Sequence, residues 1–181
     1  MWKLVAVIEE PSEVGIKRLY VEFPMVDRKI TDILKQIGHD PSAPHVHVTS
    51  IVPKELSPLC RNTLDLNEIN YLAKRMSGLS WKERITYRAV LEAFEPNTVE
   101  AAINTSFNLG CYFFVKYGRS LQDIGYDYLM ACFGYIDPIF INSLHEIGSL
   151  LMASGKGIQT SYGYVFRIGE EKKLKRLPEY L

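Results

Sequence analysis

Residues 134–168, GYIDPIFINSLHEIGSLLMASGKGIQTSYGYVFRI, indicate the fold more clearly than any other stretch. Asp137 before Pro138 is typical of a helix start, because aspartate caps free N–H groups and proline suits the first helical position. The apolar residues that follow share one helical stripe: Phe140, Leu144, Ile147 and Leu151. Residues 158–168 then alternate around a Tyr-Gly turn. The stretch predicts a helix that leads into a closing hairpin, with no catalytic residues attached.

The first 53 residues predict a β-β-α-β unit. An apolar run at residues 2–9 and an alternating run at residues 18–23 predict two strands, with a loop over residues 10–16 between them. Residues 27–38 place isoleucine and leucine on one helical stripe, start with an aspartate that can cap the helix and end with glycine. An antiparallel sheet is the simplest pairing for this unit.

Residues 45–52 alternate strictly and predict a strand, with Val46, Val48 and Val52 on its buried face. His45 and His47 then share the opposite face, where two imidazoles could bind a metal or a phosphate. Such a pair also resembles one arm of a two-histidine phosphoesterase, but that chemistry needs a second arm. A metal site needs a third ligand, and no third candidate lies at a sequence spacing typical of metal sites. Two solvent-facing histidines are the preferred interpretation, and the phosphoesterase remains the alternative.

Residues 54–108 predict a central helical unit. A loop is expected over residues 53–65, followed by three helices that start near Asn67, Ser80 and Asn97. Ser80 begins a capping box with Glu83, which makes the second start the clearest of the three.

Residues 109–169 predict a C-terminal α/β unit that the hairpin closes, and residues 170–181 predict a mobile tail. Residues 111–117 are almost continuously apolar, which is typical of a strand buried on both faces. A helix that starts at Ser120 is expected to turn four residues inward: Leu121, Ile124, Tyr128 and Cys132.

Composition excludes several classes of protein. The chain has 181 residues, and its 21 basic and 21 acidic side chains cancel, which argues against a polyanion-binding protein. Its three cysteines form no CxxC pair, so zinc-ribbon and thioredoxin-like sites are excluded. Acid appears at Glu9, too early for a signal peptide, and no apolar run is long enough to span a membrane. We therefore expect a cytoplasmic protein without a membrane partner.

Tyrosines are concentrated in the C-terminal half of the chain. They could form a stacking platform for nucleic acid, but such a platform normally lies in a basic groove. Core packing combined with an aromatic protein interface is therefore the preferred interpretation. A basic cluster at residues 172–176 could contact phosphates, but glutamates flank it, so direct nucleic-acid binding is disfavoured.

The order of these elements resembles the ArdA-type antirestriction proteins of mobile elements, over about residues 2–168. In that family a strand ends in a Phe-Pro pair, a helix ends in Ile-Gly, a helix rich in Ile, Leu and Asn follows, and a final hairpin turns at glycine. The corresponding stretches here are residues 21–24, 30–38, 66–73 and 157–166.

The resemblance implies an elongated, three-part α+β protein that acts without catalysis and without a cofactor or metal. Members of this family come from phage or conjugative elements, form homodimers and occupy the DNA-binding groove of host type I restriction-modification enzymes, with carboxylates in place of phosphates. The family is strongly acidic, whereas this chain is neutral. Either its acids are concentrated on one face, or it binds another target, for which a CRISPR nuclease is the alternative.

Two groups of residues carry these expectations. The acids of the first unit are expected to bind the partner in place of phosphates: Glu9, Glu10, Glu22, Asp27 and Asp32. The aromatic C-terminal region is expected to form the homodimer interface: Tyr126, Tyr135 and Phe140.

Overall fold

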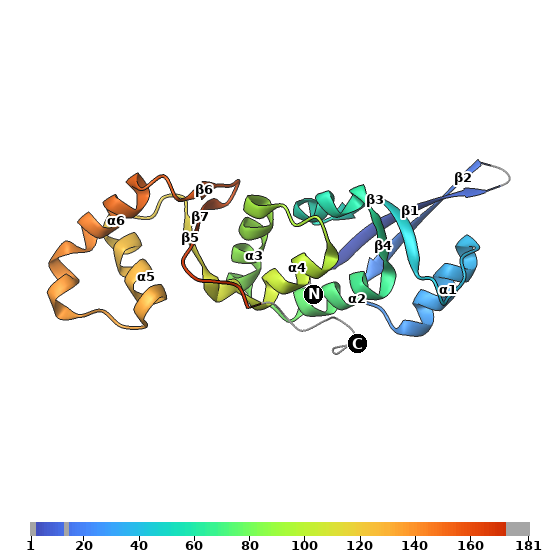
Figure 1. The fold of residues 1–181 in the computed structure, drawn as a ribbon, viewed down its shortest axis with the longest axis horizontal. Coiled ribbons are helices and arrows are strands. Elements are labelled where there is room, and N and C mark those ends of the chain that lie inside the picture. Colours follow the sequence, from blue (N-terminus) through green and yellow to red (C-terminus); the bar gives the residue numbers. More distant parts are fainter. Residues whose placement is uncertain (1–2, 13–14, 173–181) are drawn as a thin grey trace.

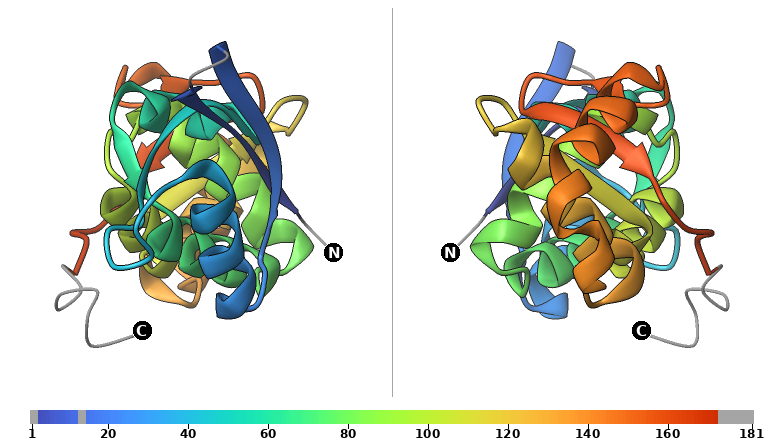
Figure 2. Two further views of the ribbon diagram at one scale, coloured as in Figure 1. Left: turned by 90° about the vertical axis from the view of Figure 1, so that its right-hand side faces the viewer. Right: turned by 90° about the vertical axis from the view of Figure 1, so that its left-hand side faces the viewer.

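The computed structural model describes residues 3–12 and 15–172 as an elongated α+β chain with small antiparallel sheets. A first sheet and one helix, residues 27–37, occupy one end of the long axis, and three helices within residues 66–107 occupy the middle (Figure 1). A second sheet and two helices within residues 121–153 form the other end. Seen along the long axis, the same elements overlap in a compact cross-section (Figure 2). The expected α+β class, with small antiparallel sheets and helices, is thereby confirmed.

The first sheet has the order β2-β1-β3-β4, all antiparallel. Its strands are β1 (Leu4–Ser12), β2 (Gly15–Phe23), β3 (His45–Val52) and β4 (Thr63–Asp65). The loop expected over residues 10–16 is wrong, because β1 and β2 stay paired as far as Ser12 opposite Gly15. Glu9 lies opposite Arg18 and Glu10 opposite Lys17, and such opposite charges favour pairing across two strands.

The prediction that Val52 is buried is wrong. Val46 and Val48 are buried as expected, but Ile51 is also buried and Val52 is exposed. A register shift between Val7 and Ile8 on β1 changes the phase of β3 at this point. An irregularity of this kind depends on the partner strand, so the alternation of residues 45–52 does not reveal it.

Helix α1 (Asp27–Ile37) ends as predicted at Gly38, which adopts the left-handed conformation with a φ of 86°. Its start differs from the prediction, because Val26 is the N-cap and Asp27 is the first helical residue. Asp27 still favours the helix start, since its negative charge complements the positive end of the helix dipole.

A 3₁₀ helix, η1 (Lys54–Arg61), and strand β4 replace the loop expected over residues 53–65. The helix buries Leu56 and Leu59 completely. The sequence did not predict this 3₁₀ helix, because it is short and contains Pro58 and therefore lacks the periodicity of an α-helix.

The central helices are α2 (Leu66–Ser77), α3 (Trp81–Phe94) and α4 (Val99–Phe107). The capping box of Ser80 with Glu83 is confirmed. The start expected at Asn97 is wrong by one residue, because the Thr98 side chain accepts a hydrogen bond from the backbone N–H of Ala101.

One hydrophobic core joins the first sheet to the central helices. Its buried residues run from Leu4 to Ile103, so the expected boundary between residues 53 and 54 does not separate two cores. Two smaller clusters lie farther along, one between α3 and the second sheet and one between that sheet and α5.

The second sheet has the order β5-β7-β6. Its strands are β5 (Tyr112–Lys116), β6 (Ile158–Gln159) and β7 (Gly163–Arg167), so the predicted hairpin is confirmed. A short 3₁₀ helix, η2 (Leu109–Cys111), precedes β5. The helix expected from Asp137 begins instead as the 3₁₀ helix η3 (Pro138–Ser143) and becomes α-helical as α6 (Leu144–Ala153).

Helix α5 (Leu121–Phe133) starts at the Ser120 cap, as predicted, and packs against α6. The two backbones approach closely at Gly125 and Gly148: a Cβ on either glycine would lie 2.0 Å from a carbonyl oxygen of the other helix. Cys132, which was predicted to point inward, is exposed.

The first residues of the expected tail are bound to the body of the protein. Glu171 accepts hydrogen bonds from Asn104 and Tyr112, and the backbone N–H of Lys172 donates to the Asn108 side chain at 2.9 Å. Residues 171 and 172 therefore lie against the central helices and the second sheet. Residues 173–181, with most of the basic cluster, lie outside the described residues.

Within residues 3–12 and 15–172, no helix has both the length and the apolar character needed to cross a membrane.

Candidate interaction surfaces

Four of the five acids predicted to bind a partner lie beside a basic side chain. Arg18 donates to Glu9 at 2.5 Å, and Lys3 donates to Glu22 at 2.5 Å. The two other pairs are more widely spaced: His39 to Glu10 at 3.2 Å and Lys74 to Asp27 at 3.5 Å.

Asp32 is exposed on α1 and lines a groove against β2 together with Glu22 and Lys29. The five carboxylates therefore do not form a continuous unpaired row. Basic neighbours reduce the negative field that they present to a partner.

His45 and His47 are exposed on the same face of β3, as the alternation predicts. They lie opposite Asp65 and Thr63 of β4. In the part of the chain that the structure describes, no three His, Cys, Asp or Glu side chains come together to hold a metal ion. The two imidazoles thus stand on an open strand face.

The end of the molecule formed by α5, η3 and α6 carries several large apolar side chains that are exposed to solvent. All three residues predicted for the homodimer interface lie in this region and are exposed: Tyr126, Tyr135 and Phe140. Four other large apolar residues in this region are exposed but were not predicted for the interface: Phe133, Ile139, Ile141 and Leu150. Ile139 is 75% exposed and Leu150 is 72% exposed. We call these seven residues the apolar end surface.

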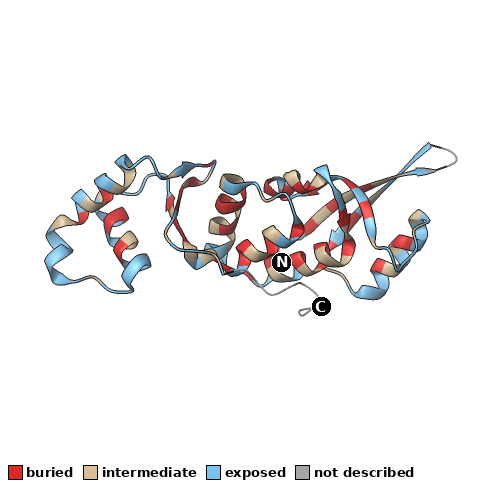
Figure 3. Cartoon of the chain, viewed as in Figure 1, coloured by how far each residue is buried: buried red, intermediate tan, exposed pale blue. Residues whose placement is uncertain are grey.

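The sequence did contain a signal for this surface. Residues 138–141 read Pro-Ile-Phe-Ile, which supplies more large apolar side chains than one face of a short helix can bury. Exposed residues predominate in these elements, whereas buried residues are concentrated toward the centre and the first sheet (Figure 3). A cluster of exposed large apolar side chains is typical of a protein–protein contact.

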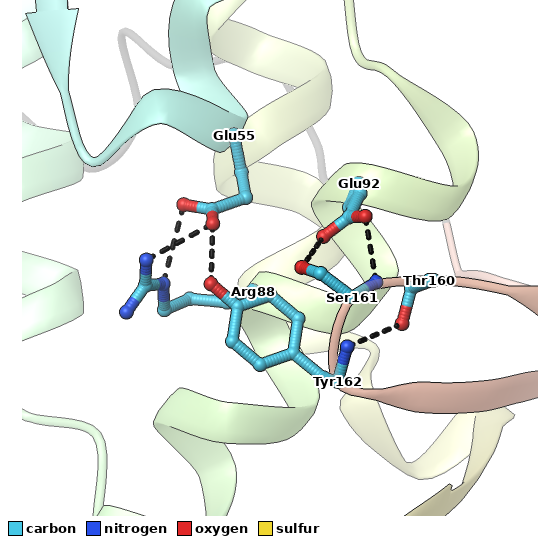
Figure 4. Close-up of polar contacts among 6 residues, drawn as sticks. All are labelled: Glu55, Arg88, Glu92, Thr160, Ser161 and Tyr162. Carbon is cyan, nitrogen blue, oxygen red and sulfur yellow. Dashed lines mark hydrogen bonds and ion pairs between the residues drawn. The ribbon is translucent and has the colours of Figure 1, made fainter.

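A buried polar network joins the central core to the turn of the closing hairpin (Figure 4). Glu55 of η1 has a side chain only 1% exposed and accepts two hydrogen bonds from Arg88 of α3, at 3.0 and 3.2 Å. The hydroxyl of Tyr162 also donates to Glu55. Beside this contact, Ser161 donates to Glu92 from its backbone N–H at 2.7 Å and from its hydroxyl at 2.5 Å.

The contacts around Glu55 shift the pKa values of Glu55, Arg88 and Tyr162. Burial alone would raise the pKa of Glu55, but the hydrogen bonds from Arg88 and Tyr162 outweigh it and hold the pKa below its ordinary value of 4.5. Burial, together with the hydrogen bond to Glu55, raises the pKa of Tyr162 to about 12. Glu55 is therefore ionised in the folded protein at neutral pH.

No family model, curated protein sequence or solved structure matches this chain.

The lowered pKa of Glu55 predicts a specific loss of stability in acid. Because the unfolded chain takes up this proton first, the stabilisation by Glu55 is complete above its ordinary pKa of 4.5 and is lost as the pH falls through the lowered value. The free energy of unfolding of wild type should therefore decrease more steeply between pH 5 and pH 3 than that of Glu55→Gln, by up to about 1.4 kcal/mol per pH unit. Urea unfolding of both proteins across this range measures the difference, and equal slopes would contradict the prediction.

Proposed function

We propose that this chain is a non-enzymatic anti-defence inhibitor, similar to ArdA-type antirestriction proteins, that occupies the DNA-binding groove of a host nuclease complex. A type I restriction-modification enzyme is the proposed target. The chain acts by filling a cleft of another protein, without making or breaking a covalent bond.

The elongated arrangement of the chain is the observation that carries this proposal. The first sheet, the central helices and the second sheet with its helix pair follow one another along a single long axis (Figure 1). A rod of this kind suits a long groove built for duplex DNA better than it suits a closed reaction site. The three-part order also agrees with the resemblance in sequence.

The apolar end surface supports a homodimer formed end to end. Its large side chains lie at one end of the rod, so two copies that bury this surface against each other roughly double the length of the inhibitor. A symmetric dimer uses the same patch on both copies, which requires only one such surface per chain.

The paired acids of the first unit restrict the form of DNA mimicry that we propose. Since Arg18, Lys3 and Lys74 lie beside Glu9, Glu22 and Asp27, the negative charge that remains available at these three positions is small. Shape and local contacts, with Asp32 among them, therefore provide more of the proposed binding than a row of carboxylates does. Displacing the bases from the exposed pairs costs a partner little, because surface ion pairs are worth about 0–1 kcal/mol.

Replacing Ile139 with aspartate is expected to weaken the homodimer. The substitution removes an apolar side chain from the apolar end surface and places a charge there, which should cost about 2–3 kcal/mol of association free energy in total, or about 30- to 160-fold in dissociation constant. Sedimentation velocity over a concentration series measures the change. Ile16→Asp is the matched control, because Ile16 is 72% exposed on β2, far from this surface.

A cleavage assay tests the proposed function directly. Wild type in excess should block cleavage of unmodified DNA by a type I restriction enzyme, Ile16→Asp should do the same, and Ile139→Asp should need a higher concentration. A parallel reaction with a CRISPR nuclease distinguishes the two targets. Complete cleavage by both enzymes at high excess of the chain would overturn the proposal.

A further inference from the structure

A cleft of about 670 Å³ lies between α3, the end of β5 and the turn of the closing hairpin. Two kinds of side chain dominate its lining: the aromatic residues Trp81, Tyr117 and Tyr162, and the basic residues Arg84, Arg88 and Lys116. Its volume lies within the range of about 300–1,000 Å³ that is typical of small-molecule sites. The apolar end surface and the five acids do not contribute to it.

The walls of this cleft are fixed by polar contacts behind them. The hydroxyl of Tyr117 donates to the carbonyl of Thr160 at 2.7 Å and accepts from the Gln159 side chain at 3.1 Å. Tyr162 is bound to Glu55, and the guanidinium of Arg88 lies 5.1 Å from the centre of the Tyr162 ring. A ligand would thus meet a wall that is already organised, which reduces the entropy lost on binding.

Two side chains at the cleft remain available to a ligand. Trp81, at the start of α3, is 74% exposed, so its indole can stack on a planar ring. Lys116 is exposed and, among the described residues, has no carboxylate partner. The residues that line the cleft in the described part of the chain include no acid, whereas glutamates lie just outside it, with Glu92 bound to Ser161.

We propose that this cleft binds a free nucleotide of the nucleoside monophosphate class. The base stacks on Trp81, and the phosphate binds the ammonium of Lys116. The positive charge is confined to the cleft and bordered by Glu92, which suits a single phosphate better than the extended backbone of a nucleic-acid strand. This site is separate from the proposed inhibition of a nuclease and does not depend on it.

Fluorescence of Trp81 provides the test. The chain has two tryptophans, and Trp2, which lies outside the described residues, is replaced in a Trp2→Phe background so that Trp81 alone reports. AMP should quench this fluorescence saturably. Adenosine, which lacks the phosphate, and ribose 5-phosphate, which lacks the base, should each bind at least tenfold more weakly.

Substitutions in the same background assign the contacts. Lys116→Ala should weaken AMP binding at least tenfold, whereas Lys82→Ala, which removes an exposed lysine of α3 that does not line the cleft, should leave it within twofold. Calorimetry of the Trp81→Ala variant, in which fluorescence cannot report, should show at least a tenfold loss as well. Circular dichroism confirms that each variant is folded.

Several results would overturn the proposal. The first is that AMP shows no saturable binding up to millimolar concentration. The second is that ribose 5-phosphate binds as tightly as AMP. The third is that Lys116→Ala and Lys82→Ala lose the same amount of affinity for AMP. Tighter binding of a single-stranded DNA 12-mer than of AMP would assign the cleft to a nucleic-acid strand instead.

Discussion

Replacing Arg88 with methionine is expected to destabilise the protein by about 3 kcal/mol, because it leaves the Glu55 carboxylate buried without its cation. The side chain of Glu55 is 1% exposed, so water cannot replace the lost guanidinium. Methionine preserves most of the apolar stem, which limits the effect to the charge and its hydrogen bonds. Chemical denaturation of wild type and variant measures the loss.

Two further variants separate this interaction from a general effect of losing an arginine. Arg119→Met removes a pair with Asp127 in which both side chains are more than 40% exposed, and it should cost less than about 1 kcal/mol. The double variant Glu55→Gln with Arg88→Met should recover at least half of the loss, because the buried charge is gone and the amide still accepts from Tyr162. Equal effects of Arg88→Met and Arg119→Met would contradict the interpretation.

Replacing Gly148 with alanine is expected to cost about 2 kcal/mol. The new Cβ would lie 2.0 Å from the carbonyl oxygen of Leu121, a backbone atom that cannot move without separating α5 from α6. Overpacking of this kind costs about 3 kcal/mol. The higher helix propensity of alanine returns about 1 kcal/mol of it.

Gly110→Ala is the matched control for this prediction, since a Cβ at Gly110 meets no atom within 4 Å. Its free energy of unfolding should stay within about 0.5 kcal/mol of wild type. Because α5 and α6 carry the apolar end surface, Gly148→Ala should also weaken the proposed homodimer, whereas Gly110→Ala should not. A Gly148→Ala protein as stable as the control would show that the two helices can separate freely.

Local signals predicted much of this fold. The capping box at Ser80, the glycine end of α1 and the final hairpin depend on residues close together in the chain, and the structure confirms all three. Features decided by distant partners were missed. The length of the β1–β2 hairpin depends on cross-strand pairing, and the phase change that exposes Val52 depends on an irregularity opposite β3.

The candidate surfaces were predicted less completely, for the same reason. The sequence identified exposed aromatic residues of the apolar end surface, because aromatic residues are concentrated in the C-terminal half of the chain. It could not show that Arg18 lies beside Glu9, or that Tyr162 reaches Glu55, since those partners meet only in three dimensions. The network around Glu55 and the cleft beside Trp81 were therefore not anticipated.

The buried residues are divided unequally along the chain, so different parts of the protein should unfold with different free energies. The largest core spans the first sheet and the central helices, while α5 and α6 depend on a small cluster around Phe113 and Phe166. Partial unfolding should therefore begin at the end with the helix pair and leave the larger core intact. A melting temperature followed by one spectroscopic signal would report an average over regions that come apart separately, and amide exchange would resolve them.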